Sequence, residues 1–295
     1  MPKTEYWHWY VEEFSPTEMH HHALEETYYS GRTAFQSVAV VRSSTFGKML
    51  IIDGDTQSAQ ADERIYHEAL VHPALAAASN RRDVLILGGG EGATLREVLR
   101  CPDVRACTMV DIDGEVVELS KRYLPEWGAD AWSDPRARVI IGDALKFLRE
   151  EESQFGVVIS DLTEPLEDSP SHPLFNASVF QDIKARLSSG GVYVLQASDV
   201  PHHKAQLHAK MARTLRGFFQ HVSSFSTHVP AFDTEWSFLA CSDAVDVAAL
   251  EAARIEAYCS KLTGESMFYD AETHRRLFAL PLYLRRMLAR PGDTF

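Results

Sequence analysis

Several features that would point to particular classes of protein are missing from this sequence of 295 residues. Its four cysteines show no CxxC pair and no metal-ligand spacing, which predicts reduced thiols rather than a zinc site or a disulfide framework. No apolar run approaches the roughly 20 residues that a membrane helix needs. The first residues also lack the basic and apolar regions of a signal peptide. We therefore expect a cytoplasmic protein without a membrane partner.

A surplus of basic residues is missing as well. The net charge of −13 at pH 7 would repel a phosphate backbone, so we expect no nucleic-acid partner. The same charge is compatible with a small cationic substrate, although it does not identify one. The triplet His20, His21 and His22 does not predict a metal site, because consecutive residues of a strand point to opposite faces.

Residues 1–75 differ in composition from the rest of the chain. Segments such as "AFQSVAVVRS" and "KMLIIDG" are rich in β-branched residues, which are typical of strands, and Asp53-Gly54 is a candidate hairpin turn. We predict a small antiparallel β domain over 1–75 and a larger domain over 76–295. A stretch with helical periodicity, residues 63–78, leads from one to the other.

From Asp83 onward, predicted strands and helices alternate. The predicted strands are 83–89, 107–113, 137–143, 155–162 and 192–198. Helical patterns follow most of them, including one over 178–191 that ends in two glycines, and the segment 245–262 is also predicted to be helical. This rhythm is typical of an α/β fold with a doubly wound parallel sheet, of the Rossmann type.

The glycine-rich turn "LGGGEGAT" connects the first strand of this series to its helix. Ligands of such sheets bind at the carboxyl ends of the strands, where Glu91, Asp111, Asp143 and Asp161 fall. Asp111 follows the glycines by about 20 residues, the spacing of an acid that binds a ribose diol. Each feature also has a structural explanation, since the glycines could serve helix packing and Asp111 or Asp143 could cap helices. Together, the four acids favour a nucleoside site.

Glu91 narrows the choice of nucleoside. No lysine follows the turn, which argues against a phosphate-binding P-loop, and a carboxylate would repel the pyrophosphate of a dinucleotide. S-adenosylmethionine would place its own carboxylate near the turn. A decarboxylated S-adenosyl compound keeps its amine, and this ammonium would form a charge-assisted hydrogen bond with Glu91.

Four motifs resemble the polyamine aminopropyltransferases, the spermidine synthase family: "LILGGGEGATLREVLR", "DIDGEVVELSKRYLP", "DGDTQSAQADERIYHEALVHPAL" and "SDLTEP". The third is most similar to thermospermine synthases and to bacterial triamine or agmatine aminopropyltransferases. The resemblance covers nearly the whole chain. It implies a small N-terminal β domain on a methyltransferase-like Rossmann domain, in a homodimer or homotetramer. It also implies transfer of an aminopropyl group from the co-substrate decarboxylated S-adenosylmethionine to a di- or polyamine. Methylthioadenosine would be released, and no prosthetic group would be needed.

The same resemblance implies roles for individual residues. Five would hold the thioadenosine part of the donor: Gln36, Asp111, Asp143, Ala144 and Pro170. Glu91 would bind the aminopropyl ammonium. Five would line the side where the amine enters: Tyr66, His67, Asp161, Glu164 and Gln196. Among them, Asp161 would accept the proton of the amine.

The sequence departs from the family pattern at four places. Ala144 replaces the glycine of a "DG" pair, Glu164 replaces an aspartate, Phe232 stands where the family has a pocket tyrosine, and "EPLEDSPSHPLF" carries two extra residues. The last three concern the acceptor side, so the sequence does not decide among putrescine, agmatine, spermidine and an N-aminopropyl amine. Two other functions stay open, namely an S-adenosylmethionine-dependent methyltransferase and a non-catalytic paralogue that binds nucleosides or polyamines.

Overall fold

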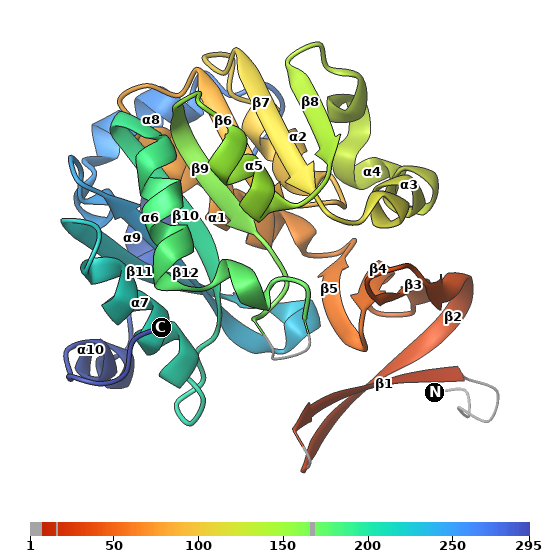
Figure 1. The fold of residues 1–295 in the computed structure, drawn as a ribbon. Helices are drawn as coiled ribbons and strands as arrows, with labels where there is room; N and C mark the ends of the chain where they lie inside the picture. The colour runs from red at the N-terminus through yellow and green to blue at the C-terminus, as the bar shows by residue number, and fades with distance from the viewer. Residues whose placement is uncertain (1–7, 16, 166–168) are drawn as a thin grey trace.

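The computed structural model describes residues 8–15, 17–165 and 169–295. Two β-sheets organise the molecule, and Figure 1 shows the N-terminal one at the lower right. This first sheet is antiparallel and follows the sequence order. Its strands are β1 (His8–Ser15), β2 (Glu18–Arg32), β3 (Ser37–Ser43), β4 (Gly47–Ile52) and β5 (Asp55–Ala59). Asp53 and Gly54 form the predicted turn between β4 and β5, both with positive φ.

The second sheet has the strand order β11-β12-β10-β9-β6-β7-β8. Its strands are β6 (Asp83–Gly88), β7 (Ala106–Asp111), β8 (Ala137–Ile141), β9 (Phe155–Asp161), β10 (Leu187–Asp199), β11 (His221–Val229) and β12 (Thr234–Ser242). Strands β6 to β10 pair in parallel, and β11 and β12 form an antiparallel edge. The predicted α/β fold with an N-terminal antiparallel sheet is confirmed. The strand order reverses between β6 and β9, and this switch point is where such sheets bind ligands.

Helices pack around the second sheet (Figure 1). The α-helices are α1 (Glu63–Ala77), α2 (Ala93–Leu99), α3 (Gly114–Tyr123), α4 (Pro125–Gly128), α5 (Ala144–Glu150), α6 (Ala177–Arg186), α7 (Gln206–Arg216), α8 (Ala252–Cys259), α9 (Ala271–Leu277) and α10 (Leu282–Leu288). The described residues also form the short 3₁₀ helices η1 (Ala129–Ser133), η2 (His172–Leu174), η3 (Pro230–Phe232) and η4 (Val247–Ala249). Among the described residues, none of these helices is both long and apolar enough to cross a membrane.

Two of the predicted helices are shorter in the structure. The one expected over 178–191 ends at Arg186, because Leu187 already pairs with Phe155 of β9 and Gly190 has a φ of +71°. The pattern over 245–262 forms η4 and then α8 rather than one helix, because the backbone at Leu250 is extended. Neither difference moves a predicted site residue.

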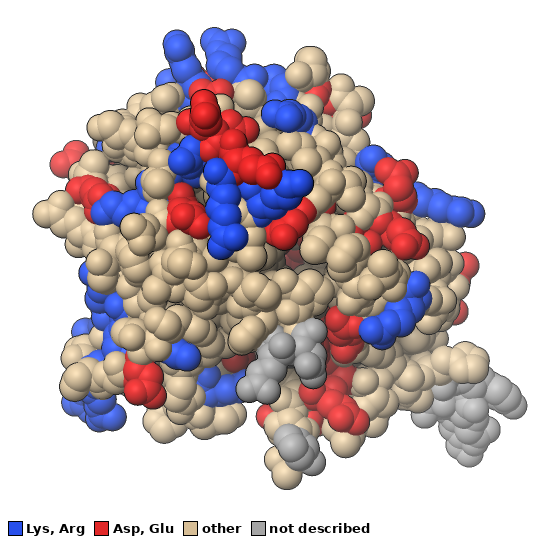
Figure 2. All heavy atoms as spheres, in the orientation of Figure 1, with Lys and Arg blue, Asp and Glu red and all other residues tan. Residues whose placement is uncertain are grey.

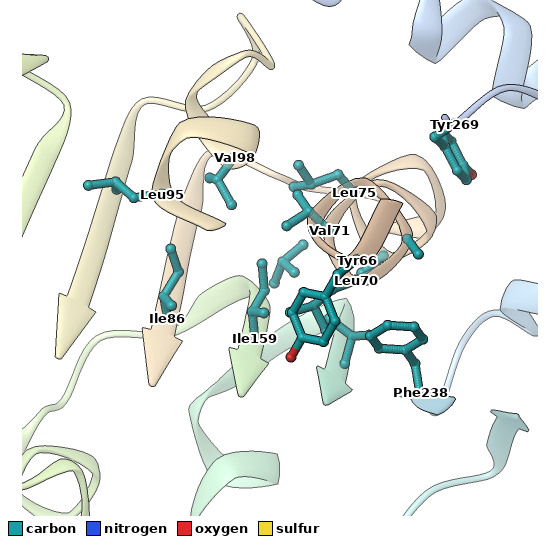
Figure 3. Close-up of a cluster of buried hydrophobic side chains, with 14 of the residues drawn as sticks. Tyr66, Leu70, Val71, Leu75, Ile86, Leu95, Val98, Ile159, Phe238 and Tyr269 are labelled. Atoms are coloured by element: carbon teal, nitrogen blue, oxygen red, sulfur yellow. The ribbon is translucent and has the colours of Figure 1, made fainter. Parts of the chain in front are cut away.

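Helix α1 fixes the relation between the glycine turn and the residues that face it. Figure 3 shows its apolar side chains against those of β6, β9 and α2. The labelled members of this buried cluster include Leu70, Val71, Leu75, Ile86, Leu95 and Ile159. Burial of each such side chain contributes about 1.5–3 kcal/mol, so the helix is held firmly in place. The predicted domain boundary between residues 75 and 76 lies inside α1 and stays a prediction.

Candidate active site

A cavity of about 680 Å³ lies at the carboxyl ends of β6, β7 and β9 and is lined by both sheets. Ten predicted site residues line it: Gln36, Tyr66, Glu91, Asp111, Asp143, Ala144, Asp161, Glu164, Pro170 and Gln196. His67 lies behind this wall and contacts Glu91. Figure 2 shows acidic and basic side chains interspersed over the face of the molecule that it draws.

The glycines of the turn bring it into contact with β9. Gly88, Gly89 and Gly92 all have positive φ, which glycine adopts without strain. A Cβ atom on Gly88 would lie 2.2 Å from the carbonyl oxygen of Asp161, and the Gly89 amide donates to that oxygen at 2.9 Å. The packing role considered for the glycines is therefore real. It also brings Asp161 and Glu91 to the same cavity.

Glu91 points into the molecule and not into solvent. Its Oε2 accepts a hydrogen bond from Ser58 Oγ at 2.6 Å, and its Oε1 lies 2.6 Å from His67 Nε2. Trp127 Nε1 in turn donates to Ser58 Oγ at 2.8 Å. Ser58 belongs to β5, and its position could not be predicted from local sequence because the two segments meet only in the tertiary fold.

His67 is placed between two carboxylates. Its Nδ1 lies 2.6 Å from the carbonyl oxygen of Glu63, while Nε2 faces Glu91, so both ring nitrogens face acceptors and the ring is an imidazolium. Burial alone would lower the pKa of His67, but Glu91 and Glu63 outweigh it and raise this pKa well above the ordinary value. Arg96 pairs with both carboxylate oxygens of Glu63 at 3.0 and 2.8 Å. Because Arg96 pairs with Glu63, the positive charge of His67 is left to balance part of the negative charge of Glu91.

Asp161 receives a hydrogen bond on each carboxylate oxygen. Tyr66 donates to Oδ1 at 2.9 Å, and Thr94 Oγ1 donates to Oδ2 at 2.6 Å. Burial and the nearby Asp161 raise the pKa of Tyr66 well above its usual value, so the phenol keeps its proton and acts as a donor. The two donors fix the carboxylate at the end of β9, facing the cavity.

Asp111 and Asp143 differ in their local roles. The side chain of Asp113, not that of Asp111, caps α3, whereas Asp143 Oδ1 caps α5 by accepting from Leu145 N at 2.7 Å. The capping explanation therefore applies to Asp143 but not to Asp111. Burial, followed by the charge of Asp113, raises the pKa of Asp111 to about 6. Gln36 Nε2 donates to Asp113 Oδ2 at 3.0 Å.

The other end of the cavity carries acids that the sequence did not single out. Glu12, Asp55 and Asp199 line it together with the predicted Glu164. Burial, followed by Glu12 and Glu164, raises the pKa of Asp55 to about 6. Asp199 follows a predicted strand directly, so the strand-end rule would have found it. The positions of Glu12 and Asp55 depend on how the N-terminal sheet lies against the second sheet.

The three departures on the acceptor side have different outcomes. Phe232 and Glu164 line the cavity, and Phe232 packs edge-on against Tyr66 with ring centroids 6.1 Å apart. The loop that carries the two extra residues includes residues 166–168, which lie outside the described residues.

In the described part of the chain, no three His, Cys, Asp or Glu side chains are arranged to hold a metal ion.

Comparisons with known proteins agree with this architecture. A spermine/spermidine synthase domain is matched over residues 63–250, and a spermidine synthase tetramerisation domain over residues 8–60. A polyamine aminopropyltransferase of Sulfolobus acidocaldarius is 42% identical over 283 residues, which are 96% of this chain and 93% of that protein. One of Aeropyrum pernix is 41% identical over 288 residues, covering 96% and 91%. These names specify no branch of the family, so the resemblance to thermospermine, triamine or agmatine enzymes stays a prediction.

Two solved structures share the whole fold. A spermidine synthase in complex with the transition state analogue AdoDATO has a TM-score of 0.89 and 26% identity, covering 98% of this chain and 96% of the other. The spermidine synthase from Thermotoga maritima has a TM-score of 0.86 and 25% identity, covering 98% and 95%. With two matched domains, relatives about 40% identical along nearly the full length, and this common fold, the chain belongs to the spermine/spermidine synthase family.

Proposed function

We propose that this protein is a polyamine aminopropyltransferase, which moves the aminopropyl group of decarboxylated S-adenosylmethionine to a di- or polyamine and releases methylthioadenosine. The observation that carries the proposal is the charge of the cavity. Among the described residues that line it, ten carry carboxylates and two, Arg32 and Lys204, are basic. Such a cavity favours a cationic sulfonium donor and a polycationic acceptor over anionic ligands.

The acceptor amine must lose a proton before it can attack. With a lysine-like pKa of about 10.4, a free amine is almost fully protonated at neutral pH and has no lone pair to donate. Asp161 is the proposed general base, because its carboxylate faces the cavity and keeps lone pairs beyond those used by Tyr66 and Thr94. The two donors hold it in one orientation.

The transfer itself is a single displacement. The freed nitrogen lone pair forms a bond to the carbon beside sulfur, the carbon–sulfur bond breaks, and its electron pair neutralises the sulfonium. The proton removed from nitrogen goes to Asp161. Neutral methylthioadenosine leaves, so the reaction needs neither a covalent intermediate on the protein nor a prosthetic group. Carboxylates that hold the remaining ammonium groups keep the reactants aligned, which lowers the entropic part of the barrier.

The proposed roles are those that the family resemblance implies, given to residues at or next to the cavity wall. Those for the thioadenosine part of the donor are Gln36, Asp111, Asp143, Ala144 and Pro170. Glu91 is proposed to bind the aminopropyl ammonium. Those for the amine are Tyr66, Asp161, Glu164 and Gln196, with His67 acting through its contact with Glu91.

One observation favours a second candidate, S-adenosylmethionine-dependent methyl transfer. Because His67 partly balances Glu91, a donor carboxylate near the turn would meet less repulsion than an unpaired Glu91 would exert. The first candidate is supported better, because Glu164, Asp199 and Asp55 provide further carboxylates for a polycationic acceptor.

A direct assay separates the two candidates. The protein is incubated with either decarboxylated or ordinary S-adenosylmethionine and with putrescine, agmatine or spermidine, and the products are identified by mass. We expect an amine enlarged by one aminopropyl group, together with methylthioadenosine, from the decarboxylated donor alone. A methylated amine from the ordinary donor would support the second candidate. Absence of any product from either donor would favour a non-catalytic binding protein.

The assembly and location of the protein belong to the same proposal. The match to a tetramerisation domain over residues 8–60 supports an oligomer, and we propose a homodimer or homotetramer. We further propose that it acts in the cytoplasm on small amines, without nucleic-acid or membrane partners. The net charge of −13 supports the absence of nucleic-acid binding.

A further inference from the structure

Ser198 has an unusual backbone conformation for its residue type. Its φ is +70°, in the left-handed region that favours glycine, and the residue is 3% exposed. Such a conformation costs a non-glycine residue about 1–2 kcal/mol. It occurs in β10, beside the cavity, where Gln196 and Asp199 both line the wall. Strain of this kind persists only where neighbouring contacts hold the residue in place.

The strain coincides with a β-bulge. Gln196 pairs with Phe238 and Asp199 pairs with Trp236, so Ala197 and Ser198 together oppose a single residue of β12. Bulges are frequent next to active sites because they redirect side chains. Here the bulge interrupts regular pairing near the carboxyl end of β10, where Gln196 and Asp199 line the cavity.

Hydrogen bonds hold both sides of the bulged residue. The Ser198 amide donates to Gln196 Oε1 at 3.0 Å, and the Ser198 carbonyl oxygen lies 2.6 Å from Ser237 Oγ. Ser237 is completely buried and is itself 2.8 Å from His208 Nδ1. Gln196 is also fixed, because its Nε2 donates to the Leu162 carbonyl oxygen at 2.8 Å. The backbone of Ser198, and with it the direction of its Cα–Cβ bond, is therefore held in place by Gln196 and Ser237.

The hydroxyl of Ser198 lies between two carboxylates. It donates to Glu164 Oε1, and Asp199 Oδ1 is 3.2 Å away. A hydroxyl has one proton, so it serves one carboxylate at a time. Asp199 has an additional partner in Lys204, whose Nζ is 3.1 Å from Oδ2. In the described part of the chain, Ser198 is the side chain with a hydrogen bond to the Glu164 carboxylate.

We propose that Ser198 is a positioning residue for the acceptor: the bulge directs its hydroxyl so that Glu164 is held beside Asp199 as the binding site for the second cationic group of a diamine or longer polyamine. This inference rests on the proposed function. Two carboxylates and one ammonium, that of Lys204, leave a net charge of −1, which one further ammonium would neutralise. Burial raises the pKa of Glu164 and so disfavours its ionised form. A cation bound beside this carboxylate would favour the ionised form again.

The test uses two variants that both remove the hydroxyl and differ in backbone strain. Ser198→Ala removes the hydroxyl and keeps a Cβ at positive φ, whereas Ser198→Gly removes the hydroxyl and relieves the strain. A hydrogen bond to a charged group contributes enough that its loss changes binding by about ten-fold or more. We therefore expect both variants to raise the KM for the acceptor about ten-fold, with the donor KM within two-fold of wild type. Ser198→Gly should also melt at a higher temperature than Ser198→Ala.

The acceptor is the amine that wild type converts fastest, and Ser242→Ala is the matched control. Ser242 is a buried serine at the other end of β12 whose hydroxyl donates to Gly191 O at 2.8 Å, so its loss should leave the acceptor KM unchanged. An unchanged acceptor KM in Ser198→Gly, or an equal rise in the donor KM, would overturn the positioning role while leaving the proposed function intact. A wild type that converts no amine would overturn both proposals.

Discussion

At the scale of single residues, the site depends on carboxylates whose partners give each a separate task. Asp161 is the one that meets the reacting nitrogen in the proposed mechanism. Asp161→Asn keeps the shape of the side chain and an oxygen that accepts from one of the two hydroxyls, those of Tyr66 and Thr94, but removes the base. We expect kcat to fall at least about 100-fold, the lower range of general-base contributions, while the donor dissociation constant changes little. Calorimetry with the donor and steady-state rates measure the two quantities, and turnover within a few-fold of wild type would contradict the assignment.

Glu91 differs from Asp161 because its carboxylate forms an ion pair with His67. Glu91→Gln removes the negative charge but keeps an oxygen acceptor for the Ser58 hydroxyl, so the turn should keep its shape. We expect weaker binding of decarboxylated S-adenosylmethionine and a smaller preference over the ordinary donor, since a cationic His67 would then lie unbalanced near the ammonium. Competition between the two donors measures this preference. If the ratio of the two dissociation constants stays the same, Glu91 does not select the donor.

At the scale of secondary structure elements, Asp62 shows how the start of α1 is tied to η3. Its Oδ2 accepts from Ala231 N at 2.6 Å, but its Oδ1 is buried without a hydrogen-bond partner. Burial raises the pKa of Asp62 from 3.8 to about 6. At a pH above its folded-state pKa, such an acid is ionised in both states, and burying the charge lowers the stability of the folded protein. At a pH below its unfolded-state pKa, the acid is neutral in both states and this loss of stability disappears. The loss therefore grows between about pH 4 and pH 6 and is complete above it.

Asp62→Asn is accordingly expected to stabilise the protein at pH 8, by up to about 3 kcal/mol at about 1.36 kcal/mol per pKa unit. The gain should shrink as pH falls from about 6 towards 4. Denaturant titrations at pH 8 and pH 4.5 measure it. Asp270→Asn is the control of opposite sign, because hydrogen bonds from Thr273 lower the pKa of Asp270 and its ionised form is favourable. A gain that does not depend on pH would show that the buried charge is not the cause.

The glycine turn is the element on which donor binding depends most. Gly88→Ala places a Cβ atom 2.2 Å from the backbone of Asp161, so the turn and β9 must separate, and we expect the donor KM to rise at least about ten-fold. Gly54→Ala is the matched control, since Gly54 has a φ of +92° but no atom within 4 Å of the added Cβ. Both variants carry backbone strain, and only Gly88→Ala carries the clash. Equal donor KM values in the two variants would contradict this account.

The elements show where sequence reasoning succeeded and where it could not. The strands of the second sheet and the acids that follow them were predictable, because hydrophobic period and strand-end position are local properties. The positions of Ser58, Glu12 and Asp55 were not, because Ser58 contacts Glu91, and Glu12 and Asp55 line the cavity, only when the first sheet packs against the second. The bulge at Ser198 could not be predicted from the sequence for another reason. The strand pattern of "VYVLQAS" carries no sign of it, since the strain is imposed by β12 and by Gln196.

At the scale of the whole molecule, the β1–β2 hairpin has two different faces. Cross-strand partners share a face, so the pairs Val11–His21 and Glu13–Met19 place Val11 and Met19 together. Both are exposed, at 41% and 51%, although they are apolar. The opposite face carries Glu12, which is buried and binds Thr56 of β5. Apolar groups that lie exposed together on one face of a hairpin are typical of an interaction surface.

This hairpin lies within the segment matched by the tetramerisation domain, and we therefore expect its exposed face to join subunits. Val11→Glu places a charge on that face without touching the cavity, and it should reduce the mass of the assembly in sedimentation velocity. Leu282→Glu is the control, because Leu282 is also an exposed apolar residue, at 51%, and lies on α10. Its assembly should match wild type, with both variants showing a wild-type circular dichroism spectrum. If Val11→Glu has the same mass as wild type, subunits do not associate through this face of the hairpin, because a charge could not be buried there without a partner.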